Sequence, residues 1–235
     1  MKTDIRLAGV LLSMYGSAAL AQSYNDMRHI SVTERRMAAQ KQPYDAQAQQ
    51  KLAEALYSIE YKQVGNVVRC DVAPSAIQDE AIAHLSKAVL LSPNHYDWQS
   101  TLGMYLINRE RYQEAILHLK QSLHLLGPVK PFNVRQGGPS NVMQIAQSAF
   151  SSHSILGDSL VKIGRYEEAE FHYRRALQFD PDADWVLLGI GNAMNGEGKR
   201  FQARAAWQKI ISHSPSQTFY TKQARLKLEK YPAAP

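Results

Sequence analysis

The sequence predicts an all-α fold built from stacked helix-turn-helix repeats. Small residues and prolines recur at a step of 34 residues, in the pairs Gly157 and Gly191, Ala169 and Ala203, and Pro181 and Pro215. Each copy contains two runs of apolar residues at helical spacing, separated by a short break. Proline cannot continue a helix, so its recurrence marks the end of each unit. A period of this length is typical of stacked helical repeats.

The copy that ends at Pro181 shows the pattern most clearly. Its first run contains Ile155, Leu156, Leu160 and Ile163, Gly164 then breaks it, and its second run contains Tyr166, Ala169, Tyr173, Ala176 and Leu177. Two short amphipathic helices around a glycine turn account for this spacing. Similar copies are found at residues 97–127 and 185–215.

The first copy is interrupted. Helices are expected at residues 45–60 and 75–93, with an insertion near 62–75 between them, and a second insertion near 128–141 precedes the third copy. Insertions in repeat arrays map to loops, which can be functional or mere loop growth. The last segment, 217–235, has one apolar stripe and several lysines and arginines, so it predicts an amphipathic capping helix and a tail. The array therefore occupies residues 44–216.

These spacings resemble the tetratricopeptide (TPR) repeat family over residues 46–215. The resemblance implies a right-handed solenoid of about four repeats, whose first helices line a concave groove that holds peptides or partner helices. Carried over by register, the groove positions are Tyr57, Asp97, Ser100, Met104, Ile107, Asn108, Ser154, Asp158, Lys162, Trp185, Leu188 and Asn192.

The implied groove is mixed in character. Family members that hold acidic chaperone tails use lysines and asparagines on successive first helices, whereas the matching slots here include Met104 and Asp158. Apolar side chains among amides instead suit a helix or an extended peptide. Packing of Trp185 and Leu188 against the closing helix is the alternative.

The first 21 residues predict a cleavable secretory signal. Lys2 and Arg6 precede an apolar stretch, and small residues stand before Gln22. The stretch is shorter than a spanning helix needs, although an uncleaved anchor or a buried helix is the alternative. The only cysteine is Cys70, so a lipoprotein is not expected. We expect an exported, periplasmic, soluble protein whose residues 22–43 form a polar arm, either disordered or a strand that orders on a partner.

No cofactor, metal site or catalytic site is expected. The common catalytic and phosphate-binding motifs are missing from the sequence. His84, His118 and His172 occupy equivalent second-helix slots, but the ~10 Å spacing of stacked helices is too wide for them to share one ion. The alternative of an enzyme site in the insertions would depend on Arg69, Cys70, Asp71 and Arg135.

The sequence therefore favours a non-enzymatic scaffold or assembly factor of the cell envelope that binds a protein or peptide partner. The most specific form of this hypothesis is a role in assembling a pilus or a secretion apparatus. The alternative is an adaptor for peptidoglycan or outer-membrane assembly proteins. The formal net charge of +6 is scattered along the chain without aromatic interleaving, so nucleic acid is not expected. Peripheral contact with membrane or cell wall stays open.

Overall fold

The computed structural model describes residues 32–58, 61–64, 67–70, 75–213 and 218–232. Backbone contacts divide the chain into two compact units, Met1–Pro93 and Asn94–Pro235. The predicted signal sequence, residues 1–21, lies outside the described residues. Within the described part, no helix is both long enough and apolar enough to cross a membrane.

The first unit contains one helix pair and a hairpin. Helix α3 (Ala46–Ser58) packs against α4 (Ser75–Leu91), as the broken first repeat predicted. Between them, β1 (Tyr61–Val64) and β2 (Val67–Cys70) pair antiparallel, with Tyr61 opposite Cys70. The first insertion thus contains a two-stranded sheet, where the repeat pattern predicted only a loop.

Residues 32–41 form a helix in the part of the chain that was expected to be a polar arm. Val32 and Ala39 are buried, so this helix has an apolar side. Arg36 donates two hydrogen bonds to the Glu80 carboxylate on α4, at 3.0 Å and 2.6 Å. The paired geometry of the guanidinium and the carboxylate fixes the helix against α4.

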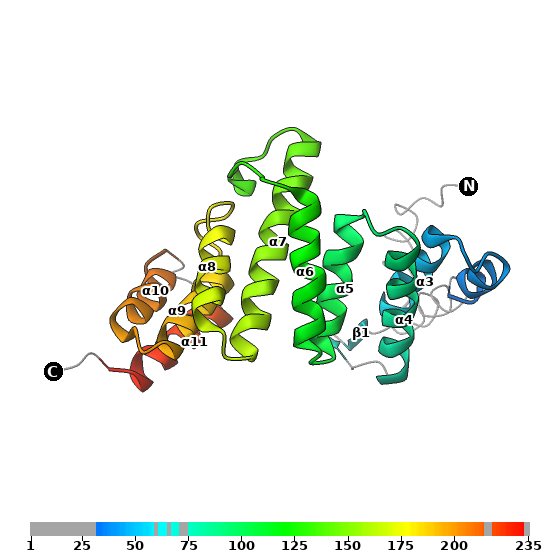
Figure 1. The fold of residues 1–235 in the computed structure, drawn as a ribbon. Helices are drawn as coiled ribbons and strands as arrows, with labels where there is room; N and C mark the ends of the chain where they lie inside the picture. The colour runs from blue at the N-terminus through cyan, green and yellow to red at the C-terminus, as the bar shows by residue number, and fades with distance from the viewer. Residues whose placement is uncertain (1–31, 59–60, 65–66, 71–74, 214–217, 233–235) are drawn as a thin grey trace, which may run out of the picture. The chain divides into compact units, whose positions relative to one another are not determined.

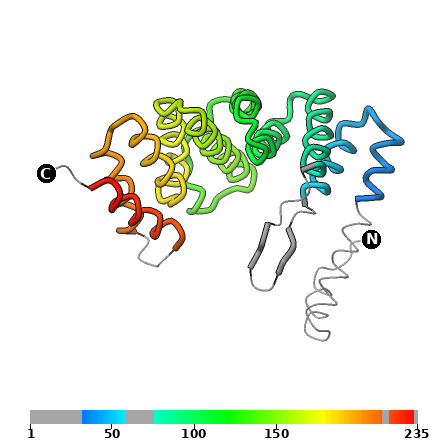
Figure 2. The backbone as a smooth tube through the Cα atoms, turned by 90° about the horizontal axis from the view of Figure 1, so that it is seen from below, coloured from blue at the N-terminus to red at the C-terminus, as the bar shows by residue number. Residues whose placement is uncertain are grey.

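The second unit contains three further helix pairs and a closing helix (Figure 1). The pairs are α5 (Tyr96–Asn108) with α6 (Tyr112–Leu126), α7 (Ser140–Lys162) with α8 (Tyr166–Ala176), and α9 (Asp184–Gly196) with α10 (Arg200–His213). Figure 2 shows these pairs following one another along the unit. Helix α11 (Phe219–Lys230) packs on α9 and α10, as the predicted cap should, and a short 3-10 helix, η1 (Val134–Gln136), lies in the second insertion.

A glycine in each first helix of this unit meets a large side chain 16 residues later. A Cβ added to Gly103 would lie 2.6 Å from Leu119, one added to Gly157 would lie 2.7 Å from Tyr173, and one added to Gly191 would lie 2.3 Å from Trp207. Atoms of a folded interior do not approach so closely. Only glycine therefore permits the observed approach of the paired helices.

The turns inside the three pairs adopt the same left-handed backbone conformation. Gly164 has φ of 77° and Gly198 has φ of 81°, but the equivalent position in the first of these pairs is Glu110, with φ of 57°. A side chain in this conformation costs roughly 1–2 kcal/mol. The α5–α6 turn therefore carries strain that the other two turns avoid.

Replacement of Gly157 by Ala should lower the free energy of unfolding by about 1–3 kcal/mol, because the added methyl group would overlap the Tyr173 ring. Urea denaturation followed by circular dichroism measures this loss. Gln147 is exposed on the same helix, so Gln147→Ala is the control and should change the stability by less than about 0.5 kcal/mol. Equal stability of Gly157→Ala and the wild type would contradict the close-approach argument.

Replacement of Glu110 by Gly should raise the free energy of unfolding by about 1 kcal/mol, since relief of the left-handed strain exceeds the added freedom of the unfolded chain. The reverse change at the equivalent turn, Gly164→Ala, should lower it by a similar amount. Thermal denaturation of the two variants tests the pair. A destabilised Glu110→Gly protein would show that the glutamate contributes something that outweighs its backbone strain.

Candidate functional site

Eleven of the predicted groove positions lie on three helices that contact one another in sequence. We call this set the first-helix face: Asp97, Ser100, Met104, Ile107 and Asn108 on α5; Ser154, Asp158 and Lys162 on α7; and Trp185, Leu188 and Asn192 on α9. Helix α7 contacts both α5 and α9, so the three helices form one layer of the second unit. The remaining position, Tyr57, belongs to α3 of the first unit and is buried.

The positions of this face differ in their access to solvent. Asp97, Met104, Asn108 and Lys162 are exposed, and Met104 retains 38% of its accessible surface. The half-buried positions are Ser100, Ile107, Asp158, Trp185, Leu188 and Asn192. The accessible part of the face therefore combines an apolar side chain with carboxylate, amide and ammonium groups.

Ser154 is a correction to the predicted set, because its side chain is fully buried. Its hydroxyl donates to the backbone carbonyl of Phe150 at 2.8 Å, one turn earlier on the same helix. A serine that is satisfied by its own helix can be buried as alanine would be. Ser154 and Tyr57 are therefore part of the core and cannot contact a partner directly.

The Ser100 hydroxyl belongs to a serine network that the sequence pattern did not predict. Ser152 on α7 donates to Ser100 at 3.1 Å, and the Ser152 and Ser122 hydroxyls lie 3.2 Å apart. Ser122 on α6 also donates to the carbonyl of Tyr96 at 2.8 Å. Because Ser122 and Ser152 are buried, these bonds satisfy polar atoms that water cannot reach. The network joins α5, α6 and α7.

Asp158 is the most perturbed carboxyl group of the face. The Tyr173 hydroxyl donates to its Oδ1 at 2.6 Å, and Lys162 lies one turn further along α7. Burial raises the pKa of Asp158 to about 6, although the Tyr173 hydrogen bond and the Lys162 charge act in the opposite direction. Burial and the neighbouring carboxylate also raise the pKa of Tyr173. At neutral pH, Asp158 is thus a partly desolvated anion that an added donor would stabilise.

Trp185 contributes both to the fold and to the face. Its ring meets the ring of buried Phe150 edge to face, with centroids 5.6 Å apart and an interplanar angle of 82°. Such aromatic contacts are worth about 0.5–1.5 kcal/mol beyond the buried area. Trp185 therefore packs against α7, whereas packing against the closing helix was the alternative from the sequence.

The second insertion is attached to the turn between α8 and α9. The Val134 amide donates to the Phe179 carbonyl at 2.9 Å, and Arg135 donates to the Asp180 carboxylate at 2.6 Å and to the Asp182 carbonyl at 3.1 Å. Asp180 itself is buried. These bonds give Arg135 a structural role.

The catalytic alternative named Arg135 together with Arg69, Cys70 and Asp71. The side chains of Arg69 and Cys70, and the whole of Asp71, lie outside what the structure describes. Arg135 is engaged by Asp180 and Asp182. Among the described residues, no group of three or more histidine, cysteine, aspartate or glutamate side chains is arranged to hold a metal ion.

Comparison with known proteins identifies the repeat and the fold. A family model described as a TPR repeat matches residues 157–198, which run from the C-terminal end of α7 to the turn after α9. A search of the curated proteins finds no match.

The fold is similar to those of solved MamA structures. One crystal structure of MamA aligns at a TM-score of 0.60 and 16% identity, over 92% of this chain and 99% of that one. A second aligns at 0.59 and 16% over 92% and 96%, and MamA from Desulfovibrio magneticus RS-1 aligns at 0.59 and 15% over 86% and 98%. At these identities the likeness concerns the fold alone. The chain therefore carries a TPR repeat match at residues 157–198 and has a fold similar to that of the MamA structures.

Proposed function

We propose that this protein is a non-enzymatic interaction scaffold that binds a segment of a partner protein on the first-helix face. The observation that carries the proposal is the layer formed by α5, α7 and α9, because consecutive helices of this layer contact one another. Exposed Met104 and half-buried Ile107 and Leu188 offer apolar contacts, while Asn108 and Asn192 add amide groups. Binding surfaces commonly combine apolar anchors with surrounding hydrogen-bonding groups.

The chemistry of Asp158 suggests what kind of segment suits this face. A half-buried carboxylate whose pKa is raised to about 6 is stabilised by a new hydrogen-bond donor or by a cation. Its present donor is the Tyr173 hydroxyl, which occupies one oxygen. The partner segment would therefore present apolar side chains together with a lysine, an arginine or an exposed amide group near Asp158.

A role as an assembly factor in the cell envelope is the finer form of this proposal. It is supported by the signal-like pattern of residues 1–21 and by the TPR fold, which commonly serves protein binding. A pilus or secretion apparatus is the machine we favour. An adaptor for peptidoglycan or outer-membrane assembly proteins is the alternative, and an enzyme with its site in the insertions is the less favoured one.

The double variant Met104→Ala with Leu188→Ala should reduce capture of a crosslinked partner at least tenfold. Loss of two central apolar contacts costs binding free energy, and about 1.4 kcal/mol corresponds to a factor of ten. The measurement is in-cell crosslinking of the tagged full-length protein, followed by quantitative mass spectrometry of envelope fractions.

The matched control for this experiment removes two apolar side chains from second helices of the same unit. Leu117 and Phe171 retain 68% and 57% of their accessible surface, so Leu117→Ala with Phe171→Ala should leave capture unchanged. Helicity by circular dichroism must persist in both double variants. Loss of capture in the control alone would place the binding surface on the second helices and overturn the proposal.

The export hypothesis predicts a mature protein that begins at Gln22. Cleavage after the small residues of the apolar stretch would remove residues 1–21. Amino-terminal sequencing of the protein from its native host measures this directly, with the cytoplasmic fraction as the comparison. A mature chain that retains Met1 would contradict the envelope role without affecting the interaction surface.

A further inference from the structure

The same interhelical polar contact occurs in three helix pairs of the structure. The Nδ1 atom of a second-helix histidine contacts the first helix in each: His84 to Gln49 Oε1 at 2.6 Å, His118 to Gln99 Oε1 at 2.8 Å, and His172 to His153 Nδ1 at 3.0 Å. All three first-helix partners stand three residues before a buried leucine, which is Leu52, Leu102 or Leu156. The third pair, α7 with α8, therefore has a histidine at the first-helix position where the other two pairs have a glutamine. The fourth pair has Leu187 and Ala206 at these positions.

The glutamine pairs and the histidine pair respond differently to protons. A glutamine Oε1 atom only accepts, so the facing imidazole must donate from Nδ1. Protonation of that imidazole at Nε2 leaves this bond intact. In the third pair, one Nδ1 donates and the other must accept, and acceptance requires an unprotonated nitrogen. Once both rings are protonated, two N–H groups face each other.

The ring geometry of the third pair suits a shared proton. The ring centroids of His153 and His172 are 5.3 Å apart and the Nδ1 atoms 3.0 Å apart, so the rings point at each other end to end. Ligands of one metal ion would instead direct their lone pairs toward a point beside this line. The geometry thus favours a hydrogen bond between the two rings over a metal ion.

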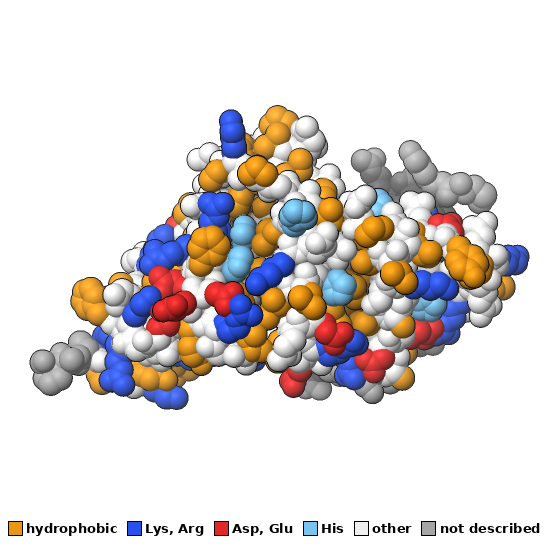
Figure 3. Space-filling model, viewed as in Figure 1, with side chains coloured by type: hydrophobic (Ala, Val, Ile, Leu, Met, Phe, Trp, Pro, Cys, Tyr) orange, Lys and Arg blue, Asp and Glu red, His pale blue; other side chains and the backbone are white. Residues whose placement is uncertain are grey.

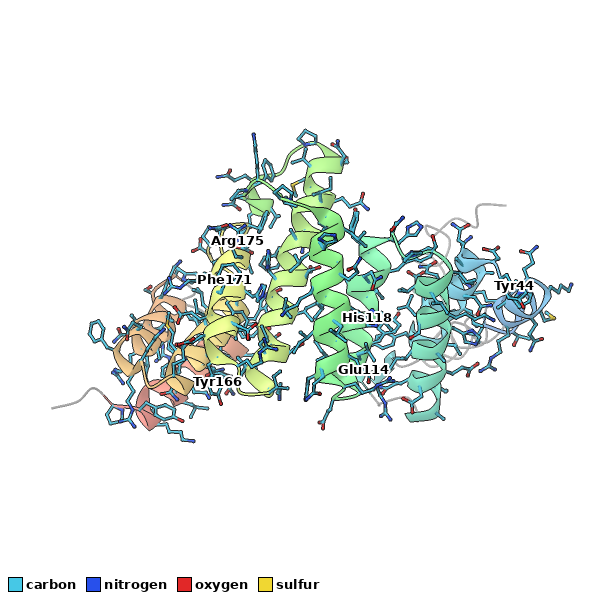
Figure 4. The ribbon with its side chains drawn as sticks, in the orientation of Figure 1. Tyr44, Glu114, His118, Tyr166, Phe171 and Arg175 are labelled. Carbon is cyan, nitrogen blue, oxygen red and sulfur yellow. The ribbon has the colours of Figure 1, made fainter. Side chains whose placement is uncertain are left out.

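The surroundings of the pair oppose additional positive charge. Lys120 of α6 and Arg175 of α8 act on the pair as cations, and Glu168 of α8 is the facing anion. Glu168 itself forms ion pairs with Arg165 and, at 3.8 Å, with Lys120. The Phe171 ring packs edge to face on His172, with centroids 5.1 Å apart. The face drawn in Figure 3 carries histidines at several places, and Phe171 and Arg175 extend from α8 (Figure 4).

We propose that His153 and His172 form an acid-sensitive latch between α7 and α8. Near neutral pH, a single Nδ1–H···Nδ1 hydrogen bond holds the two helices together at this point. Addition of a proton to both rings destroys the acceptor and places two like charges about 3 Å apart, beside Lys120 and Arg175. Acid therefore loosens this helix pair more than the glutamine pair of α5 and α6.

The direction of the pKa shifts agrees with the latch. Burial, assisted by neighbouring cations, lowers the pKa of His153 and of His172 from 6.5 to about 4. Burial also lowers the pKa of His118, which faces Gln99. Because the unfolded chain binds more protons than the folded one, the contribution of the pair is fully present above about pH 6.5. It is lost progressively as the pH falls toward 4.

The variant His153→Gln tests the latch and preserves the contact. Glutamine in this slot accepts from histidine in two other helix pairs, so the variant keeps a bond to His172. At pH 5, a histidine with a pKa of about 4 takes up about 0.9 proton on unfolding. On unfolding at pH 5, the His153→Gln protein should thus take up about 0.9 proton fewer than the wild-type protein. Urea unfolding of the full chain between pH 4.5 and 6 gives this number from the slope of the unfolding free energy against pH.

Two further variants complete the test. His124 is exposed on α6, and His124→Gln removes a histidine without altering a helix pair, so it should keep the wild-type slope. Gln99→His creates a second pair of facing imidazoles and should steepen the slope. An unchanged slope in both His153→Gln and Gln99→His would overturn the proposal. Imidazole nitrogen chemical shifts that show both rings protonated in the folded protein at pH 5.5 would overturn it as well.

Discussion

The close approach of paired helices at glycine is the constraint on which the second unit depends. Tyr173 illustrates it best, because its ring fills the space over Gly157 in its own pair and over Gly189 in the next. One side chain therefore sets the separation of α7, α8 and α9 together. Its hydroxyl also reaches Asp158, so the same packing fixes the carboxylate of the first-helix face. A side chain at either glycine would displace the ring and the hydrogen bond with it.

The repeat period predicted the helix pairs and the closing helix, because small and bulky residues recur at fixed offsets wherever helices stack. Two segments that do not follow the period were misjudged. Residues 61–70 carry β-branched valines on both sides of Gly65 and Asn66, a hairpin signal that the interpretation as an insertion obscured. Residues 32–41 looked like a polar arm because their apolar side is narrow and Arg36 depends on Glu80, 44 residues away.

The register of the repeats assigned the predicted groove positions to first helices but could not give the burial of each residue. The position of a residue along a helix gives the direction of its side chain, whereas its exposure to solvent depends on the neighbouring helices that cover it. Ser154 is buried because its hydroxyl bonds to its own backbone, and Ser100 is engaged by Ser152. The recurrence of histidine in the second helices was visible in the sequence as His84, His118 and His172. Their first-helix partners could not be predicted in the same way, because two of these positions hold glutamine and the third holds histidine, so no single residue type recurs there.

The attachment of the second insertion has a consequence for how the chain unfolds. Linear repeat arrays behave as chains of nearest-neighbour couplings, in which an end repeat can fray while the others persist. The insertion begins after α6, yet Val134 and Arg135 bond to residues 179–182, beyond the whole of the next helix pair. This bridge joins the segment before α7 to the segment after α8, and so ties together the two ends of this helix pair. The stretch from η1 to the start of α9 is therefore expected to open as one cooperative block, with fraying confined to the repeats on either side.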